Sequence, residues 1–552
     1  MSAPTPTLAT KERLFVTEDG RSVAFTFAIV SSLFLLWGFC NGMIDVMDKH
    51  FQEELHLTLS QSAWVQFAHY LGYFLMAMPA GWLASRLGYK GGIIAGLLMV
   101  AVGGFWFIPA SNIAQFWAFL LGVCVIASGL TFLETVANPY TTVLGHPRYA
   151  ATRINLAQSC NGVGWILGPI AGAIFFYGKD EAGRSTGSET LWIPYAGVGV
   201  LVLLLAVLFF FAPVPEIRTR DEYHLDDENG NQQGNRARKL NRPLVFCLLW
   251  LNVAVLVGVI GMIFWLVVTG LVARLNLTAE VVRLAEALPR PAALELTPEH
   301  AVSLLLFWGA VGLLALGAVV LVPLVARIST HSIWSHPHFS GAVLAQFFYV
   351  AAQAGIFSFL INYMTSEPPA IPDWWVNSWT RDWFEISPRD GLLRISNQTA
   401  SVLASVGFVC FLTGRFTGAW LLKRFSAHMV LGLYGLLNVV ACALVFLKLG
   451  WFSAVCVFAS YFLMSIMFPT IFALGIHGLG ARAKKASAFI VMAIMGGAIL
   501  PKLMGFVADT YDMSRGFIVP LACFGVVALY GWFWPRLSQA DSLHGVSTTK
   551  GH

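Results

Sequence analysis

The chain has 552 residues, 57% of them hydrophobic and only 11% charged, and a formal net charge of +5. Because soluble proteins average about 45–50% apolar and 25% charged residues, this composition excludes a soluble domain and predicts an all-α protein that crosses the membrane many times. In such a protein the placement of Lys and Arg sets the orientation of the helices, so the positive charge does not indicate a nucleic-acid partner.

The cysteines and the N-terminal region argue against several other classes. Each of the eight cysteines stands alone in an apolar run, without the close spacings of metal sites or disulfide frameworks. The segment up to Arg21 is polar and lacks the features of a cleavable signal peptide. The sequence also has no Gly-Lys-Ser/Thr phosphate loop. We therefore expect no enzyme, no metal and no cofactor, and a proton gradient as the energy source.

Fourteen apolar stretches are each long enough to cross a membrane as a helix, which takes about 20 residues. In chain order they are residues 24–47, 61–85, 91–109, 114–142, 152–177, 191–213, 243–272, 301–326, 341–364, 396–422, 428–447, 451–476, 486–508 and 516–535. The linker after the sixth stretch ends in a run rich in Arg and Lys. By the positive-inside rule, this linker and both chain termini are predicted to be cytoplasmic.

A short motif repeats on either side of this linker. Pro139-Tyr-Thr-Thr-Val-Leu-Gly145 and Pro469-Thr-Ile-Phe-Ala-Leu-Gly475 share the pattern Pro-x4-Leu-Gly. Parallel repeats of this kind are typical of transporters, which hold the substrate between two related halves. The predicted organisation is a cytoplasmic tail at 1–23, a six-helix bundle at 24–213, a cytoplasmic linker at 214–242, an inserted transmembrane helix pair with its loop at 243–340, a second six-helix bundle at 341–535 and a cytoplasmic tail at 536–552.

Two carboxylates, Asp45 and Glu134, stand inside stretches that otherwise indicate membrane helices. Ionisable groups there usually face the interior of a bundle and mark a path for substrate or protons. The alternative is an ion pair, but the other spans of the N-terminal half carry no Lys or Arg near their middle. A carboxyl group without a cationic partner in low dielectric can take up a proton near neutral pH and release it when wetted. We expect Asp45 to carry the proton, and Glu134 to bind sugar hydroxyls and couple the two loads.

Polar side chains form stripes at helical spacing in four of the predicted spans. In the first, Trp37, Asn41 and Asp45 share one face. The other stripes are Thr131, Glu134, Thr135 and Asn138; Asn155, Gln158, Ser159 and Asn161; and Gln346, Tyr349 and Gln353. Amides, carboxylates and aromatic rings in an apolar wall suit a neutral polyhydroxylated ligand. Alternatively, the amides only bond neighbouring helices.

Several blocks of the sequence resemble the bacterial L-fucose:proton symporter family of the major facilitator superfamily. They are Phe34-Leu-Leu-Trp-Gly, Leu133-Glu-Thr-Val-Ala-Asn-Pro-Tyr, Asn155-Leu-Ala-Gln-Ser-Cys-Asn161, Gly414-Arg-Phe-Thr-Gly418, Met464-Ser-Ile-Met-Phe-Pro-Thr-Ile-Phe-Ala-Leu-Gly-Ile476 and Ser487-Ala-Phe-Ile-Val-Met. The resemblance implies a twelve-helix core that alternates between inward and outward states, with the carboxylates at Asp45 and Glu134 as the functional pair. It also implies that Trp37, Gln158, Asn161, Phe411 and Phe468 are cavity residues.

The sequence departs from the family pattern in three respects. Phe468 stands where the fucose carrier has Tyr, Gly42 replaces an Asn, and the segment 243–326 has no recognisable counterpart in the twelve-helix core. The acid at Glu134 favours the fucose branch over glucose/galactose relatives, in which an amide is expected there.

The predicted function is proton-coupled uptake of a neutral monosaccharide, with L-fucose as the best candidate, across the bacterial cytoplasmic membrane. The expected substrate-binding residues are Trp37, Asn41, Glu134, Gln158, Asn161, Gln353, Phe411 and Phe468. The expected partners are the sugar, protons and the bilayer, with no obligate protein partner. The alternatives are a glucose/galactose or N-acetylglucosamine symporter and, on the strength of the partial motif Gly164-Trp-Ile-Leu-Gly168-Pro169, a proton-driven drug exporter.

Overall fold

The structure is a computed structural model of the whole chain. The residues that it describes are 14–16, 21–54, 59–146, 149–176, 192–215, 241–274, 277–289, 297–329, 332–376, 380–386 and 391–538. The chain divides into two compact units, one formed by Met1–Leu225 with Ala345–His552 and the other by Asp226–Leu344. The predicted domain boundaries remain a prediction.

The N-terminal part of the larger unit consists of long helices. They are α1 (Ala24–Glu54), α2 (Leu59–Ile113), α3 (Phe116–Val143), α4 (Ala150–Phe176) and α5 (Trp192–Phe211). The helix α2 contains two of the predicted spans, because the chain turns sharply at Gly88, which has φ 75° and ψ −175°. Glycine adopts this positive φ without the steric cost that a Cβ atom would bring.

The C-terminal part of the larger unit is also helical and includes one short hairpin. Its helices are α10 (Pro337–Ser366), α11 (Asn397–Leu421), α12 (Ala427–Phe446), α13 (Trp451–Met464), α14 (Met467–Ile476), α15 (Ala483–Met492), α16 (Gly496–Thr510), α17 (Met513–Gly516) and α18 (Ile518–Ser538). The short 3-10 turn η7 (Ala493–Met495) joins α15 to α16. The antiparallel strands β1 (Phe384–Ile386) and β2 (Leu393–Ile395) lie between α10 and α11.

The all-α membrane fold is confirmed, whereas the predicted count of fourteen spans is only approximate. Within the described residues, 12 helical segments are long and apolar enough to cross a membrane. The two numbers differ because α2 is counted once although it holds two of the predicted spans, and because the described side chains cover only part of α4. At 27 residues, α4 is itself long enough to cross a membrane.

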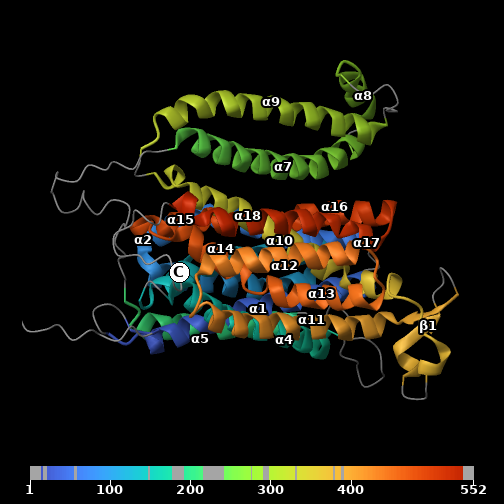
Figure 1. Cartoon of the computed structure of the whole chain (residues 1–552), viewed down its shortest axis with the longest axis horizontal. Helices are drawn as coiled ribbons and strands as arrows, with labels where there is room; N and C mark the ends of the chain where they lie inside the picture. Colours follow the sequence, from blue (N-terminus) through green and yellow to red (C-terminus); the bar gives the residue numbers. More distant parts are fainter. Residues whose placement is uncertain are drawn as a thin grey trace, which may run out of the picture. The chain divides into compact units, whose positions relative to one another are not determined.

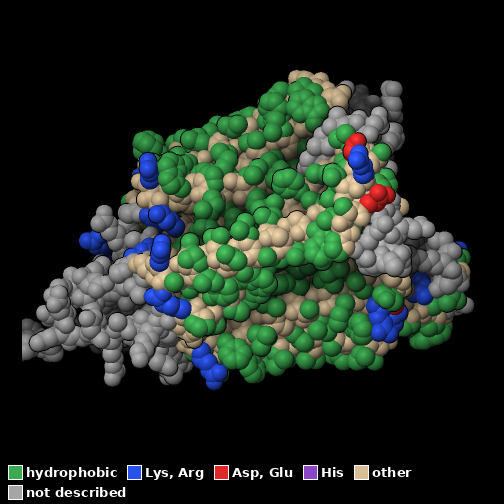
Figure 2. Space-filling model, turned by 90° about the horizontal axis from the view of Figure 1, so that it is seen from above, with side chains coloured by type: hydrophobic (Ala, Val, Ile, Leu, Met, Phe, Trp, Pro, Cys, Tyr) green, Lys and Arg blue, Asp and Glu red, His purple; other side chains and the backbone are tan. Residues whose placement is uncertain are grey.

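Helices that are distant in sequence lie side by side in each half (Figure 1). In the N-terminal half α1 packs on α4, and α2 packs on α3 and α5; in the C-terminal half α12 packs on α13 and α18, and α11 on α13. Hydrophobic side chains dominate the face shown in Figure 2, with Lys and Arg gathered near its ends. This distribution is expected of helices whose outer faces contact lipid.

Glycines allow α1 and α4 to approach closely. A Cβ atom at Gly164 would lie 2.3 Å from the backbone oxygen of Leu35, and one at Gly168 would lie 2.5 Å from that of Phe39. Small residues at such spacing commonly allow close contact between membrane helices. The glycines of the partial drug-exporter motif are therefore explained by packing within this half.

The smaller unit contains the inserted helix pair. Its elements are α7 (Arg242–Arg274), α8 (Thr278–Glu286), α9 (Pro298–Ala326) and the short turn η3 (Ile333–Ser335). A small core joins α7 to α9, formed by Val245, Leu249, Leu321 and Val325. The indole nitrogen of Trp250 donates a hydrogen bond to the backbone oxygen of Leu314 at 3.3 Å. The pair thus packs against itself along its length.

Candidate functional site

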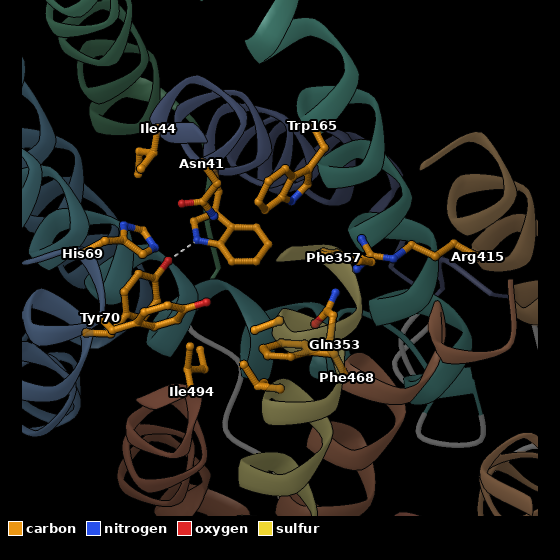
Figure 3. A pocket seen from close by; sticks show the side chains of 14 residues that line it. Asn41, Ile44, His69, Tyr70, Trp165, Gln353, Phe357, Arg415, Phe468 and Ile494 are labelled. Atoms are coloured by element: carbon orange, nitrogen blue, oxygen red, sulfur yellow. Dashed lines mark hydrogen bonds between the residues drawn. The ribbon is translucent and has the colours of Figure 1, made fainter. Parts of the chain in front are cut away.

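A cavity lies between the two halves of the larger unit (Figure 3). The volume open to the centres of water-sized spheres is about 110 Å³, whereas one water requires about 10–15 Å³ by the same measure. Its lining comes from α1, α2 and α4 on one side and from α10, α11, α14 and η7 on the other. The lining residues are Trp37, Asn41, Ile44, His69, Tyr70, Tyr73, Trp165, Val350, Gln353, Ala354, Phe357, Arg415, Phe468 and Ile494.

The wall from the N-terminal half combines aromatic rings with unused hydrogen-bonding atoms. The indole nitrogen of Trp37 donates a hydrogen bond to the hydroxyl of Tyr73, and the ring of His69 lies 5.1 Å from that of Tyr73. Asn41 Oδ1 and His69 Nδ1 are buried and have no hydrogen-bond partner within the described part of the chain. Because buried polar atoms are normally paired, these two are available to a ligand's hydroxyl groups.

The opposite wall is mostly apolar and carries one amide and one cation, Arg415. Gln353 on α10 lies beside Phe357 and Phe468 (Figure 3), and the Phe468 ring is 6.4 Å from that of Tyr349. Of the predicted binding residues, the structure therefore brings Trp37, Asn41, Gln353 and Phe468 to one cavity.

Glu134 lies behind this cavity, and it is not a lining residue. Its side chain is buried on α3, and neither carboxylate oxygen has a hydrogen-bond partner among the described residues. Asn138 and Tyr73 are the polar side chains near its carboxylate, and Arg415 acts on it through its charge. Of these, Tyr73 and Arg415 also stand in the cavity wall.

The other predicted proton-coupling residue is less well defined. Asp45 belongs to α1, but its side chain lies outside the described residues. The neighbouring Ile44, one position earlier on the same helix, lines the cavity. The role of Asp45 therefore stays a prediction.

Gln158, Asn161 and Phe411 are buried but do not line the cavity. Gln158 Nε2 donates to Asn138 Oδ1 at 3.1 Å. This bond joins α4 to α3, as expected if the amides only bond neighbouring helices. Asn161 is buried beside α1, and neither atom of its amide has a partner among the described residues. The binding roles of these three residues stay predictions.

Sequence analysis overlooked Arg415 as a site residue. It lies on α11, is 3% exposed and lines the cavity. Its Nε donates to the backbone oxygen of Ser465 at 3.1 Å, and its Nη1 donates to the backbone oxygen and the Oε1 of Gln158. The guanidinium also stacks over Phe411 at 4.6 Å. The rule that singled out the two acids, an ionisable group within an apolar span, applies equally to this arginine.

A second buried arginine, Arg153 on α4, has a structural role. Its Nε donates to the backbone oxygen of Thr141 at 3.1 Å and its Nη1 to that of His146 at 2.7 Å. These oxygens belong to the end of α3 and the turn after it, where backbone acceptors lack helical partners. Arg153 therefore caps α3 and lies apart from the cavity.

The two halves touch beyond the cavity, near the kink in α2 and the start of α15. Ser487 Oγ donates to the backbone oxygen of Thr135 at 2.7 Å, and Lys484 Nζ lies 4.1 Å from the centre of the Tyr89 ring. A Cβ atom at Gly81 would lie 2.5 Å from the Cβ of Ala488. This end of the bundle is closed.

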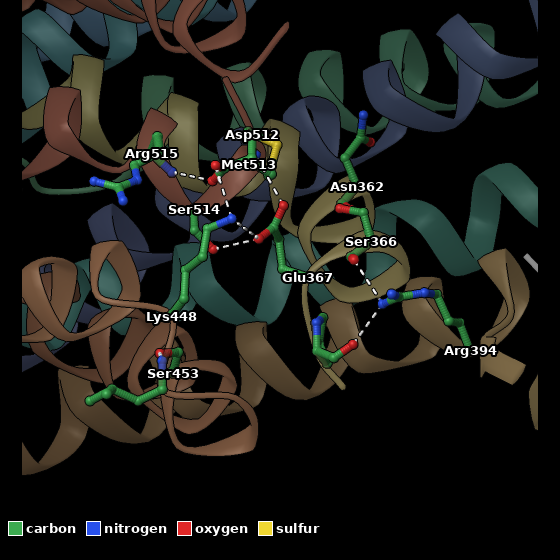
Figure 4. Close-up of polar contacts among 12 residues, drawn as sticks. Asn362, Ser366, Glu367, Arg394, Lys448, Ser453, Asp512, Met513, Ser514 and Arg515 are labelled. Atoms are coloured by element: carbon green, nitrogen blue, oxygen red, sulfur yellow. Dashed lines mark hydrogen bonds and ion pairs between the residues drawn. The ribbon is translucent and has the colours of Figure 1, made fainter. Parts of the chain in front are cut away.

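A second polar cluster lies at the opposite ends of the C-terminal helices (Figure 4). Lys448 Nζ is 2.9 Å from Asp512 Oδ2 and 3.6 Å from Glu367 Oε2. Glu367 also accepts hydrogen bonds from the backbone nitrogen of Met513 at 3.2 Å and from Ser514 Oγ at 2.8 Å. The three charged residues, which we call the clasp, tie the end of α10 to the turns that precede α13 and α17.

Comparisons with known proteins agree with this fold and cavity. The chain is 29% identical to the L-fucose-proton symporter of Escherichia coli, over 93% of this chain and 94% of the relative. It is 24% identical to the glucose/galactose transporter of Brucella abortus, over 93% and 95%. A crystal structure of the transporter FucP in the outward conformation is 29% identical, with a TM-score of 0.62 over 93% of this chain and 99% of that chain.

These relatives confirm the resemblance inferred from the sequence blocks, and they are transporters rather than enzymes. The family profile described as Major Facilitator Superfamily matches residues 23–365. Because this match covers more than half of the 552 residues, the chain belongs to the major facilitator superfamily.

Proposed function

We propose that the protein is a sugar/proton symporter that takes up a neutral monosaccharide, with L-fucose as the first candidate. The observation that carries the proposal is a buried carboxyl group, Glu134, with no hydrogen-bond partner among the described residues, next to a cavity shared by the two halves. A carboxyl group in such surroundings can bind and release a proton in the physiological range. Relatives named as sugar symporters and sugar transporters support the choice of a sugar.

The chemistry of the cavity wall supports a polyhydroxylated ligand. Asn41 Oδ1 can accept a hydroxyl proton, and the amide of Gln353 can both donate and accept. Trp37 and Phe468 offer flat apolar surfaces that can cover the hydrocarbon face of a pyranose ring. L-Fucose fits this combination, because its methyl group replaces a hydroxyl that would otherwise need a partner in the apolar part of the wall.

In the proposed cycle the protein moves sugar and proton together by alternating access. The closed end lies beside the start of α1, which we infer to be cytoplasmic, so the arrangement corresponds to an outward-facing state. Asp45 loads the proton, and Glu134 senses both the proton and the sugar. The protein resides in the bacterial cytoplasmic membrane in this proposal, with both termini inside. The remaining expected binding residues, Gln158, Asn161 and Phe411, act from behind the wall.

The decisive experiment is a panel of labelled L-fucose, D-glucose, D-galactose and N-acetylglucosamine, tested for uptake and for counterflow in proteoliposomes. We expect L-fucose to be accumulated and the external medium to become more alkaline as it enters. Asp45→Asn should abolish accumulation and leave counterflow, because exchange of sugar for sugar needs no net proton release. Preference for another sugar of the panel would reassign the substrate, and proton-driven efflux of amphipathic drugs without sugar exchange would refute the proposal.

A further inference from the structure

Arg415 is a buried cation that belongs to the C-terminal half and bonds to the N-terminal half. Its Nη1 donates to the Oε1 of Gln158 at 3.3 Å and to the backbone oxygen of the same residue. It forms no ion pair with a carboxylate in the part of the chain that the structure describes. A buried charge that has only neutral partners is costly, so this arginine needs a reason to be in the cavity wall (Figure 3).

The acid whose charge acts on Arg415 is Glu134, on α3 of the other half. A short chain of amides leads from Arg415 toward Glu134. Arg415 donates to Gln158, Gln158 donates to Asn138 at 3.1 Å, and Asn138 lies one helical turn after Glu134 on α3. The two amides are uncharged, so they neutralise neither the carboxylate nor the guanidinium.

We propose that Arg415 is the positioning cation for Glu134, and that the charge of Glu134 controls how firmly Arg415 joins the two halves at Gln158. This inference rests on the proposed function, in which Glu134 exchanges a proton, and it adds the residue of the C-terminal half that responds. When Glu134 is ionised, attraction to Arg415 strengthens the contact between the halves. When Glu134 takes up a proton from the cavity, the attraction is lost and the halves separate more easily.

Thermodynamic linkage makes this coupling reciprocal. If ionised Glu134 stabilises the contact of Arg415 with Gln158, then that contact must favour the ionised form of Glu134 by the same free energy. Release of the proton and closure of the halves therefore promote each other.

Other titratable groups face the same region and have to be separated from Glu134 in any pH measurement. They are Tyr73 and His69 from α2 and Tyr349 from α10. The predicted proton carrier Asp45, whose side chain lies outside the described residues, has to be separated as well. Phenols titrate near pH 10 and stay neutral around pH 7, whereas histidines titrate near pH 6.5. His69→Gln and Asp45→Asn backgrounds therefore serve as references.

The test is the pH dependence of L-fucose counterflow, measured from about pH 5 to about pH 9, where protein acids and histidines titrate. Arg415→Met removes the cation, and we expect the midpoint of the profile to move to higher pH by about one to three units, the effect of one nearby opposite charge. Arg415→Lys keeps the charge, and its midpoint should move less than half as far. The matched control is Arg424→Met, because Arg424 stacks on Trp420 at 4.4 Å on the exposed surface.

A double-variant cycle shows whether Arg415 acts through Glu134. In a Glu134→Gln background, Arg415→Met should produce no further shift of the profile. A shift of the same size in the Glu134→Gln background would overturn the proposal. So would an Arg415→Met profile that coincides with the profile of Arg424→Met. The same conclusion follows if Arg415→Lys shifts the profile as far as Arg415→Met. The shift should persist in the His69→Gln and Asp45→Asn backgrounds.

An infrared titration separates this inference from the proposed function. The carbonyl band of protonated Glu134 is identified as the band missing from Glu134→Gln, and its pH dependence is followed in purified protein without substrate. Loss of the cation should preserve the band to higher pH even if Arg415→Met does not transport. A band whose pH dependence is unchanged would refute the coupling, whereas failure of the unaltered protein to exchange any sugar of the panel would refute only the proposed function.

Discussion

The contact between the halves at the closed end includes a tightly packed glycine, Gly81, and its replacement should open that end. A Cβ atom at Gly81 would lie 2.5 Å from the Cβ of Ala488, which is closer than two methyl groups can approach. Overpacking of this kind costs about 1–3 kcal/mol. Because the cost falls only on the state in which the halves touch here, Gly81→Ala should increase the open population about 5- to 150-fold.

The assay is the distance between spin labels at Arg86→Cys on α2 and Lys485→Cys on α15. Both positions are exposed, and the exposed Cys247 is replaced by Ser to prevent background labelling. We expect Gly81→Ala to add a longer-distance population that the parent protein lacks.

Two controls make the result specific. Gly525→Ala, at a glycine with nothing within 4 Å of the added Cβ, should leave the distances unchanged. Ala488→Gly combined with Gly81→Ala restores the total number of methyl groups at the contact, and it should return the distribution toward that of the parent. If Gly81→Ala and Gly525→Ala give the same distances, the halves are not held together at this contact.

Three further predictions concern the clasp, Arg153 and Phe468. Burial alone would lower the pKa of Lys448, but its ion pairs with Asp512 and Glu367 outweigh burial and raise that pKa. Lys448 in turn keeps the pKa of Asp512 below its usual value, although burial acts in the opposite direction. The clasp should therefore stabilise the purified protein at neutral pH by about 1 kcal/mol or less. Thermal melts should show this contribution disappearing as the pH falls through the pKa of Asp512 or rises through that of Lys448. Lys448→Met should remove the alkaline change and weaken the acid one, because Arg515 also lowers the pKa of Asp512. Arg153→Met should lower the melting temperature and leave the sugar preference intact, because it uncaps α3 outside the cavity; altered selectivity would contradict this. Phe468→Tyr should change the L-fucose to D-galactose uptake ratio by a few-fold to about 100-fold, the range for one pocket hydroxyl, and an unchanged ratio would place the sugar elsewhere.

The helical fold was predictable because lipid demands long apolar helices, and their lengths can be read directly from hydropathy. The count was less predictable at α2, because the two stretches that hydropathy separates there are joined at Gly88, where the chain turns sharply between them.

The cavity was only partly predictable. Trp37 and Asn41 were found because they share a stripe with an acid. Tyr70 and Tyr73 were missed because aromatic residues in a span are equally consistent with lipid contact and with a cavity wall. Which face of α2 looks inward depends on its packing against α3 and α5, and a single sequence does not reveal that packing.

The two halves share a fold but carry opposite charges at the cavity. The N-terminal half supplies the acid at Glu134 and the C-terminal half supplies the cation at Arg415. The two helix ends that carry the repeated Pro-x4-Leu-Gly motif are also held differently. Arg153 caps the end of α3. In α14 the indole of Trp534 donates to the backbone oxygen of Leu474 at 3.1 Å. If each half moves as a rigid body, any motion that separates the halves also moves the buried acid Glu134 away from the buried cation Arg415. In the proposed coupling, protonation of the acid reduces that electrostatic cost, and the charge asymmetry between the two halves would link proton movement to the opening of the cavity.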